Sequence, residues 1–142
     1  MAKASLDEVR KFMVPGSEAP AAHRETPYRE LLGFLPPRIA TRFALTGVLD
    51  PTSVDLQEAI RDHALTPACF DDKTTQLLVF AILVMDLSDA AVTHAIAARR
   101  CGASWEELQA IVSLCFLFRG LPAANRGASM LAEAARHEME AQ

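Results

Sequence analysis

Apolar runs and short amphipathic segments alternate along the chain, separated by prolines, glycines and small polar clusters. The longest run, Leu77–Met85, contains nine consecutive apolar residues. A helix that spans a bilayer needs about 20 such residues, so this run predicts a core helix that is apolar on all sides. The turn-forming residues Asp86 and Ser88 follow, and then an alanine-rich segment that ends at Arg100. We therefore expect two helices folded back on each other at the centre of the domain.

The rest of the chain also predicts helices, because no segment alternates apolar and polar residues with period two. Local signals mark several ends: Pro37 as a first helical position, the turn at residues 50–53, Asp71 or Asp72 as a cap, and Ser104–Glu107 as a capping box. Gly102 favours a left-handed helix end. The expected fold class is all-α, with helices at about 4–14, 28–35, 38–49, 54–64, 73–85, 88–100, 104–119 and 122–139.

Three of these segments carry more specific expectations. Leu56 and Ile60 are predicted to form the inner stripe of the polar helix 54–64. Residues 14–27 contain three prolines and are predicted to be a linker or arm, with His23 solvated. The last helix begins with small residues that permit close packing, and its charged end from Glu133 onward is expected to fray.

Length and composition indicate a single domain over residues 1–142, with residues 1–35 as an N-terminal arm and short helices. The formal charge is −4 and no dense basic cluster is present, which argues against nucleic-acid binding. The first residues lack the continuous apolar core of a secretory signal, and no segment is expected to span a membrane. These features predict a soluble, cytoplasmic protein.

The three cysteines, Cys69, Cys101 and Cys115, form no C-x-x-C pair, and their odd number argues against a disulfide framework. Each is expected to behave mainly as a small apolar residue. Cys101, in a polar turn, is expected to be the most exposed of the three.

His94 is the main candidate for a catalytic residue, because it is the only polar residue expected to face inward on the alanine-rich segment. An imidazole can carry or release a proton near neutral pH. Held among small residues, His94 is either a packed core histidine or the site itself. His63 is instead expected at the surface, near the carboxyl end of its helix.

From about Asp71 to Ala132 the chain resembles the carboxymuconolactone decarboxylase family, whose superfamily includes the alkylhydroperoxidase D-like proteins. The resemblance lies in DDKTTQLLVFAILV, in THAIAARRCGASWEEL and in FRGLPAANRG. It implies a multihelical alkylhydroperoxidase D-like fold with its core at 71–132. It also implies a homo-oligomer, commonly a trimer or hexamer.

The peroxidase branch of that superfamily uses a C-x-x-C pair ahead of the histidine. Counting back from His94 places that pair at Leu87 and Ala90, and counting from Gln76 places its first member at Ser88, so neither count finds a sulfur. Peroxide reduction by this route needs an attacking and a resolving thiol. An alkylhydroperoxidase or peroxiredoxin-type antioxidant activity is therefore less favoured than the activity of the decarboxylase branch.

The decarboxylase branch implies a cofactor-free lyase or isomerase acting on a small carboxylated lactone or related acid, with neither metal nor organic cofactor. His94 matches that branch's histidine and is the expected proton-transfer residue. Arg119, Asn125 and Gln76 are the expected substrate-binding residues, with Arg119 suited to a carboxylate. Gln76 stands where the peroxidase branch has a glutamate, and its amide cannot relay a proton.

Structural alternatives remain open for several of these residues. Arg119 suits the carbonyl end of its own helix, and Asn125 suits a cap. Asp89 lies about 140° from His94 on an ideal helix, so it is expected to be a solvated charge. The alternative function is a non-catalytic helical oligomer or binding module that retains the scaffold without the chemistry.

Overall fold

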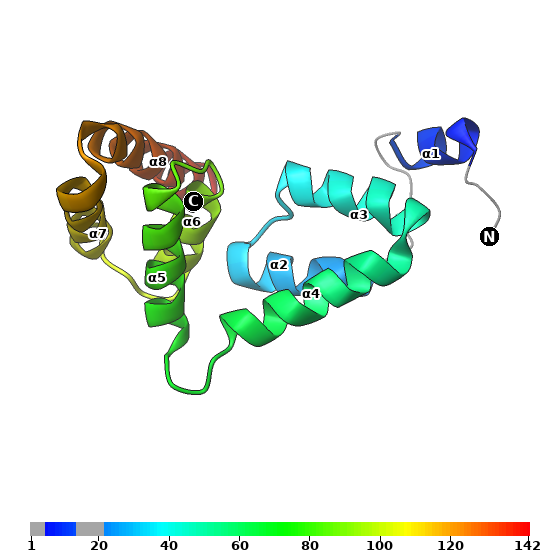
Figure 1. Cartoon of the computed structure of the whole chain (residues 1–142), viewed down its shortest axis with the longest axis horizontal. Coiled ribbons are helices and arrows are strands. Elements are labelled where there is room, and N and C mark those ends of the chain that lie inside the picture. The colour runs from blue at the N-terminus through cyan, green and yellow to red at the C-terminus, as the bar shows by residue number, and fades with distance from the viewer. Residues whose placement is uncertain (1–4, 14–21) are drawn as a thin grey trace. The chain divides into compact units, whose positions relative to one another are not determined.

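A computed structural model describes residues 5–13 and 22–142 of the chain. All regular secondary structure in these two ranges is helical, and they contain no strand (Figure 1). The all-α fold class predicted from the sequence is therefore confirmed. The helices are α1 (Leu6–Met13), α2 (Ala22–Leu32), α3 (Pro37–Leu49), α4 (Pro51–Leu65), α5 (Asp72–Met85), α6 (Ala91–Arg100), α7 (Trp105–Arg119) and α8 (Leu121–Glu140).

The chain divides into two compact units, residues 1–64 and residues 65–142. The first unit contains α1, α2, α3 and all but the end of α4, and the second contains α5, α6, α7 and α8. The segment 71–132, which carries the family resemblance, lies in the second unit.

Several helix ends fall where local sequence signals placed them. The Asp71 carboxylate caps α5 by accepting a hydrogen bond from the Thr74 amide at 2.7 Å. Ser104 and Glu107 form the predicted capping box of α7, with bonds of 3.1 and 2.7 Å between side chain and main chain. Gly102 has a φ of 93° after α6, the left-handed conformation that glycine adopts without steric penalty. These ends depend on neighbours in sequence, which is why sequence analysis located them.

The prediction of a linker over residues 14–27 is wrong for residues 22–27, which belong to α2; residues 14–21 lie outside the described ranges. Pro27 sits inside α2, where it removes the hydrogen bond to the carbonyl of His23, an exposed residue that water can satisfy. The helix then ends at Leu32, because Gly33 adopts a φ of 83°. A proline in the middle of a short helix is tolerated when the orphaned carbonyl faces solvent.

Helix α4 turns its polar side inward, so the predicted inner stripe is wrong. Leu56 and Ile60 are 60% and 69% exposed, whereas Val54 is fully buried. Glu58 is largely covered, with a side chain only 16% exposed. Amphipathic periodicity located the two faces of this helix but could not tell which face has partners.

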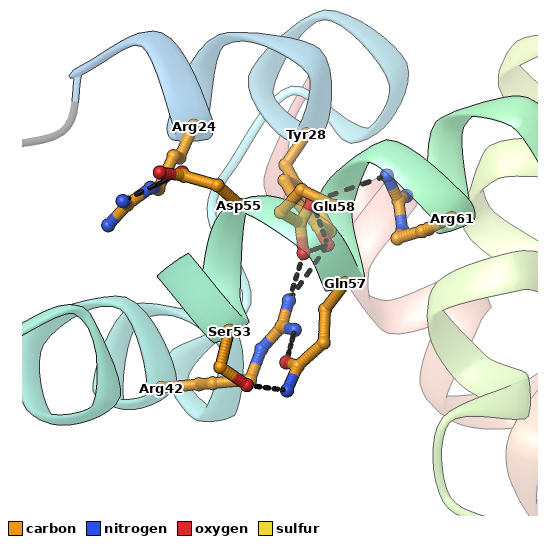
Figure 2. Close-up of polar contacts among 8 residues, drawn as sticks. All are labelled: Arg24, Tyr28, Arg42, Ser53, Asp55, Gln57, Glu58 and Arg61. Atoms are coloured by element: carbon orange, nitrogen blue, oxygen red, sulfur yellow. Dashed lines mark hydrogen bonds and ion pairs between the residues drawn. The ribbon is translucent and has the colours of Figure 1, made fainter. Parts of the chain in front are cut away.

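The partners of Glu58 form a polar cluster among α2, α3 and α4 (Figure 2). The Tyr28 hydroxyl donates to the Glu58 carboxylate at 2.9 Å, and Arg42 forms an ion pair with the same carboxylate. The Arg61 guanidinium lies 4.0 Å from the centroid of the Tyr28 ring and 3.9 Å from Glu58. Charge-assisted hydrogen bonds and a cation–π contact thus satisfy the buried carboxylate. We call Tyr28, Arg42, Glu58 and Arg61 the tyrosine cluster.

Further contacts surround the tyrosine cluster. The Phe43 ring meets the Tyr28 ring edge-on at 5.7 Å, and Arg42 also donates to Gln57 at 2.8 Å. Arg24 forms an ion pair with Asp55 at 2.7 Å. These polar contacts join α2 to α4 and α3 to α4. The apolar packing of this unit comes from residues such as Phe43 and Val54.

In the second unit, α5 and α7 run parallel. Near their amino ends Lys73 pairs with Glu107 at 2.9 Å. Farther along, the Cys115 thiol donates to the Ala81 carbonyl at 3.6 Å, and at the carboxyl ends Arg119 donates to the Met85 carbonyl at 3.2 Å. Helix α5 also packs against α6 and α8, and α8 packs against α6 and α7. The core side chains come from all four helices: Phe80, Val84, Val92, Ile96, Leu108, Val112, Met130 and Ala134.

Gly127 allows α8 to approach α7 closely. A Cβ atom at this position would lie 2.7 Å from both methyl carbons of Val112. Val112 is β-branched, so its side chain has little freedom to move aside. The predicted close packing at the start of the last helix is therefore present at Gly127.

The end of α8 is an ordered helix to Glu140, so the prediction of fraying from Glu133 is wrong. Ala134 is 1% exposed, and Glu138 forms a bidentate pair with Arg99 at 2.9 and 2.7 Å. Arg99 also lies 4.6 Å from the Trp105 ring centroid. The charged sequence of this segment predicts fraying, but one of its carboxylates binds a guanidinium on α6.

We expect Tyr28 to titrate late. Burial, opposed by Arg61 and reinforced by the hydrogen bond to Glu58, raises the pKa of Tyr28 from 10.0 to about 12. Because the folded pKa is the higher one, the stabilisation is complete below about pH 10 and is lost as pH rises toward about 12. Tyr28 is the only tyrosine, so tyrosinate absorbance against pH measures this pKa directly. Glu58→Gln should lower it; an unchanged midpoint near 10 in the native protein would contradict the cluster.

We expect Gly127→Ala to reduce the free energy of unfolding by about 1–2 kcal/mol, because overpacking against Val112 outweighs the gain of about 1 kcal/mol in helix propensity. In a Val112→Ala background the obstruction is gone, so the same substitution should become neutral or stabilising. Denaturant unfolding of the four proteins in this cycle measures the reversal. A destabilisation of equal size in both backgrounds would refute the close approach.

Candidate functional site

His94 lies on α6 and is partly exposed, among buried alanines. Ala91, Ala95, Ala97 and Ala98 are all fully buried. The sequence therefore gives α6 a face of small side chains that packs closely on its neighbours, and His94 is the one titratable residue between Ala91 and Ala98.

Gln76 on α5 holds the imidazole of His94. Its Oε1 lies 2.8 Å from His94 Nδ1, and Gln76 is only 3% exposed. An amide oxygen accepts hydrogen bonds and cannot donate them, so this contact places a proton on Nδ1. In the neutral ring Nε2 then carries the lone pair, which makes Nε2 the basic nitrogen. The predicted site residues His94 and Gln76 are thus in direct contact, across two helices.

Thr75, next to Gln76, was not singled out by the sequence. Within residues 5–13 and 22–142, its hydroxyl oxygen is the one buried side-chain polar atom without a hydrogen-bond partner. A threonine hydroxyl in a helix commonly bonds to the carbonyl one turn earlier. The Thr75 hydroxyl makes no such bond, although the Asp71 carbonyl, which accepts from the Thr75 amide at 2.9 Å, has a second lone pair. No sequence signal distinguishes this threonine from its neighbour Thr74, because the difference is one of burial.

Arg119 lies away from the histidine. Its side chain is exposed and donates through Nε to the Met85 carbonyl. Met85 is nine residues beyond Gln76 on α5, which corresponds to about 13 Å of helix rise. Arg119 thus complements a carboxyl helix end, that of α5 rather than that of its own helix.

Asn125 and Asp89 each bind residues other than His94 and Gln76. Asn125 is exposed on α8, and its main-chain carbonyl accepts a hydrogen bond from Ser129 at 3.2 Å. The next residue, Arg126, forms an ion pair with Asp89. Asp89 precedes α6, which begins at Ala91 rather than at the predicted Ser88, so the helical angle used for Asp89 does not apply.

The turn between α5 and α6 contains an unusual conformation at Leu87, with a φ of 55°. The Ser88 amide donates to the Leu83 carbonyl at 2.9 Å and the Leu87 amide to the Val84 carbonyl at 3.0 Å. This pattern ends helices and normally places glycine at the left-handed position. The turn occupies the first residues of the predicted helix 88–100, which is why α6 begins later than expected.

Burial disfavours the thiolate form of Cys101 and Cys115. Cys69 is the exposed one, whereas Cys101 is partly buried and Cys115 buried, so the expectation that Cys101 would be the most exposed is wrong. Burial raises the pKa of Cys101, helped by Asp72, and burial raises the pKa of Cys115. Both shifts disfavour the thiolate that attacks a peroxide.

Over residues 5–13 and 22–142, no three His, Cys, Asp or Glu side chains are grouped so as to hold a metal ion. Among the helices placed by the structure, none is both long enough and apolar enough to cross a bilayer.

No protein-family model matches this chain, and it has no match among curated proteins or solved structures. Functional inference therefore depends on the residues themselves: a proton-carrying ring held by a buried amide, with an unpaired hydroxyl beside that amide.

We expect Thr75→Val to raise the free energy of unfolding by about 1 kcal/mol, because it replaces a buried hydroxyl that lacks a partner with a methyl group of similar size. Thr74→Val is the matched control on the same helix and should change stability by less than about 0.5 kcal/mol. Chemical denaturation of the three proteins tests this. A loss of stability confined to Thr75→Val would show that the hydroxyl has a partner.

Proposed function

We propose that residues 65–142 form a carboxymuconolactone decarboxylase-like module with the alkylhydroperoxidase D-like fold. In this proposal the protein is a cofactor-free lyase or isomerase that acts on a small carboxylated lactone or a related acid. The family resemblance supports the substrate class and also a homo-oligomer, such as a trimer or hexamer. The four packed helices α5–α8, which contain the whole resembling segment, are compatible with it.

The observation that carries the catalytic proposal is the contact between His94 Nδ1 and the buried amide oxygen of Gln76. A general acid–base residue must be held in one orientation and one tautomer. The fixed Gln76 side chain supports both for His94. Gln76 then acts as a positioning residue, because its amide exchanges no proton at neutral pH.

The proposed reaction breaks the bond between the substrate carbon and its carboxylate and releases carbon dioxide. The electron pair from that bond moves into the conjugated lactone as the double bond shifts. Protonated His94 delivers a proton from Nε2 to the carbon that gains the electron pair, and water restores the ring's proton. The reaction also requires stabilisation of the negative charge that develops on the lactone.

Asn125 enters the proposal as a substrate-binding residue through the resemblance, and Arg119 enters it because a guanidinium suits a carboxylate. The contact of Arg119 with Met85 argues for a structural role, since it anchors that side chain about 13 Å along α5 from Gln76. A small substrate at His94 would not reach this position. The substrate carboxylate would then be held by groups nearer to Gln76.

The second candidate is a non-catalytic assembly module. The exposed apolar side chains of the second unit favour it, Phe118 with 84% and Ile82 with 66% exposure among them. Gln76 also favours it, because an amide replaces a group that could exchange protons. Thiol peroxidase activity is not proposed, given the raised thiol pKa values of Cys101 and Cys115.

We expect the purified protein to release carbon dioxide from a carboxylated γ-lactone, and His94→Ala to slow this by about 100-fold or more. His63→Ala removes an exposed imidazole on α4 and should leave turnover unchanged. Manometric or coupled detection of carbon dioxide, with circular dichroism as a folding check, measures both. Turnover that survives in His94→Ala would eliminate the catalytic role. A wild-type protein inactive on a panel of such lactones would favour the assembly module.

A further inference from the structure

We propose that the side of α5 and α7 that faces away from α6 and α8 is a self-association surface, through which two copies of this chain bind about a two-fold axis. Its central residues are Leu78 and Ile82 on α5 and Leu114 and Phe118 on α7, which we call the α5/α7 apolar face. This inference does not depend on the proposed enzymatic activity.

The parallel packing places these four residues on one side. The helices meet at Ala81 and Cys115. Where two parallel helices face each other, the residue after the contact on one and the residue before it on the other turn to the same side. Ile82 follows Ala81 and Leu114 precedes Cys115, while Leu78 and Phe118 each lie one turn away from these two on the same helix. The two helices therefore present one continuous apolar strip.

The opposite side of the same helix pair is already covered. Phe80 precedes Ala81 and is fully buried, and Val112 is 3% exposed. Val112 packs on Gly127 of α8. The unit thus uses one side of the α5–α7 pair for its own core, and the α5/α7 apolar face is a separate surface.

The exposure of this face is large enough for a stable interface. Leu78 is 43% exposed, Ile82 66%, Leu114 58% and Phe118 84%, and the adjoining Leu117 is 68% exposed. Together these side chains present on the order of 500 Å² of apolar surface. A standard interface buries about 800 Å² per partner, of which somewhat more than half is apolar. The face supplies that apolar share.

Charge favours a second copy over other partners. No charged residue occurs between Lys73 and Asp86 or between Glu107 and Arg119. The face therefore offers nothing to the phosphates of a nucleic acid or to a charged peptide. A lipid surface favours helices whose apolar side is bordered by many basic residues, whereas the charges at the ends of this face are of mixed sign, Lys73 with Glu107 and Arg119 with Asp86.

The two-fold arrangement also suits the helix dipoles. Because α5 and α7 are parallel, their partial charges have the same sign at each end of the face. A two-fold axis perpendicular to the helices sets the pair of one copy antiparallel to the pair of the other. The Lys73–Glu107 end then lies near the partner's opposite end, where the carbonyl groups carry negative partial charge. A second copy thus complements both the apolar strip and the dipoles.

Sedimentation velocity or light scattering of the full chain, from low micromolar to about 100 µM, tests the proposal. We expect an even number of copies, a dimer or a multiple of it; of the trimer and the hexamer that the family resemblance implies, only the hexamer can contain two-fold contacts. Phe118→Glu and Ile82→Glu, tested singly, should each weaken the two-fold contact by about 100-fold or more, because each would bury an unpaired charge. A dimer would become a monomer, and a larger even assembly would fall to half its size. Phe118→Ala should weaken the contact by about tenfold.

Matched controls place the same change elsewhere. Met139→Glu on α8 and Leu56→Glu on α4 replace side chains that are 73% and 60% exposed and lie outside the face; both should assemble as the wild type does. Circular dichroism and thermal unfolding verify that each variant is folded, so that loss of assembly is separated from loss of fold. Each substituted residue is exposed, so the core is unaffected.

Four outcomes would overturn the proposal. They are a wild-type chain that stays monomeric at about 100 µM, an assembly with an odd number of copies, an assembly that survives both glutamate substitutions, and one that the control substitutions weaken equally. A monomer that floats with neutral phosphatidylcholine vesicles would also reject self-association and assign the face to a lipid surface.

Discussion

The parallel packing of α5 against α7 is the constraint on which the second unit depends. Two parallel helices repel each other through their aligned dipoles, and side chains at both ends of the pair oppose this repulsion. Lys73 pairs with Glu107 at the amino ends, and the Arg119 guanidinium bonds to a carbonyl of α5 at the carboxyl ends. Because parallel neighbours need a return connection, α6, which lies between them in the sequence, runs back along α5. This places α6 against α5, and His94 within reach of Gln76.

Helix α5 separates two surfaces with different character. Gln76 and Leu78 are two positions apart and point in nearly opposite directions, about 160° apart by the helical period. Gln76 is buried and holds the imidazole of His94, while Leu78 belongs to the apolar face. A catalytic site and an assembly surface could therefore coexist in this unit, because substitutions on the exposed face need not disturb the His94–Gln76 contact. The lyase and the assembly module are in this sense separable proposals.

The first unit is stabilised by a different principle. Its α4 buries Glu58, and a phenol and two guanidinium groups from three helices compensate the carboxylate. Buried ion pairs contribute little net stability, since desolvation offsets attraction, but removal of one partner leaves an uncompensated charge. The tyrosine cluster therefore specifies how α2, α3 and α4 fit together more than it adds to their stability. The cost of this arrangement is the exposure of Leu56 and Ile60.

Much of the local structure could be predicted from the sequence. The sequence predicted the all-α class, the Asp71 cap, the Ser104–Glu107 capping box and the helix end at Gly102. These features depend on residues within four positions of one another, so they can be recognised from the sequence alone. His94 could also be singled out, because an imidazole among alanines is unusual in any packing. The resemblance to a decarboxylase family stays a prediction.

Tertiary structure decided whatever depends on partners distant in sequence. Leu56 and Ile60 face outward because Glu58 finds Tyr28, which lies 30 positions earlier. The end of α8 is ordered because Glu138 meets Arg99, 39 positions earlier. Arg119 bonds to α5 rather than to its own helix end. Local propensity determined where helices form, but which face is buried follows from the pairing of polar groups across helices, since a buried charge must find its complement wherever the fold brings one.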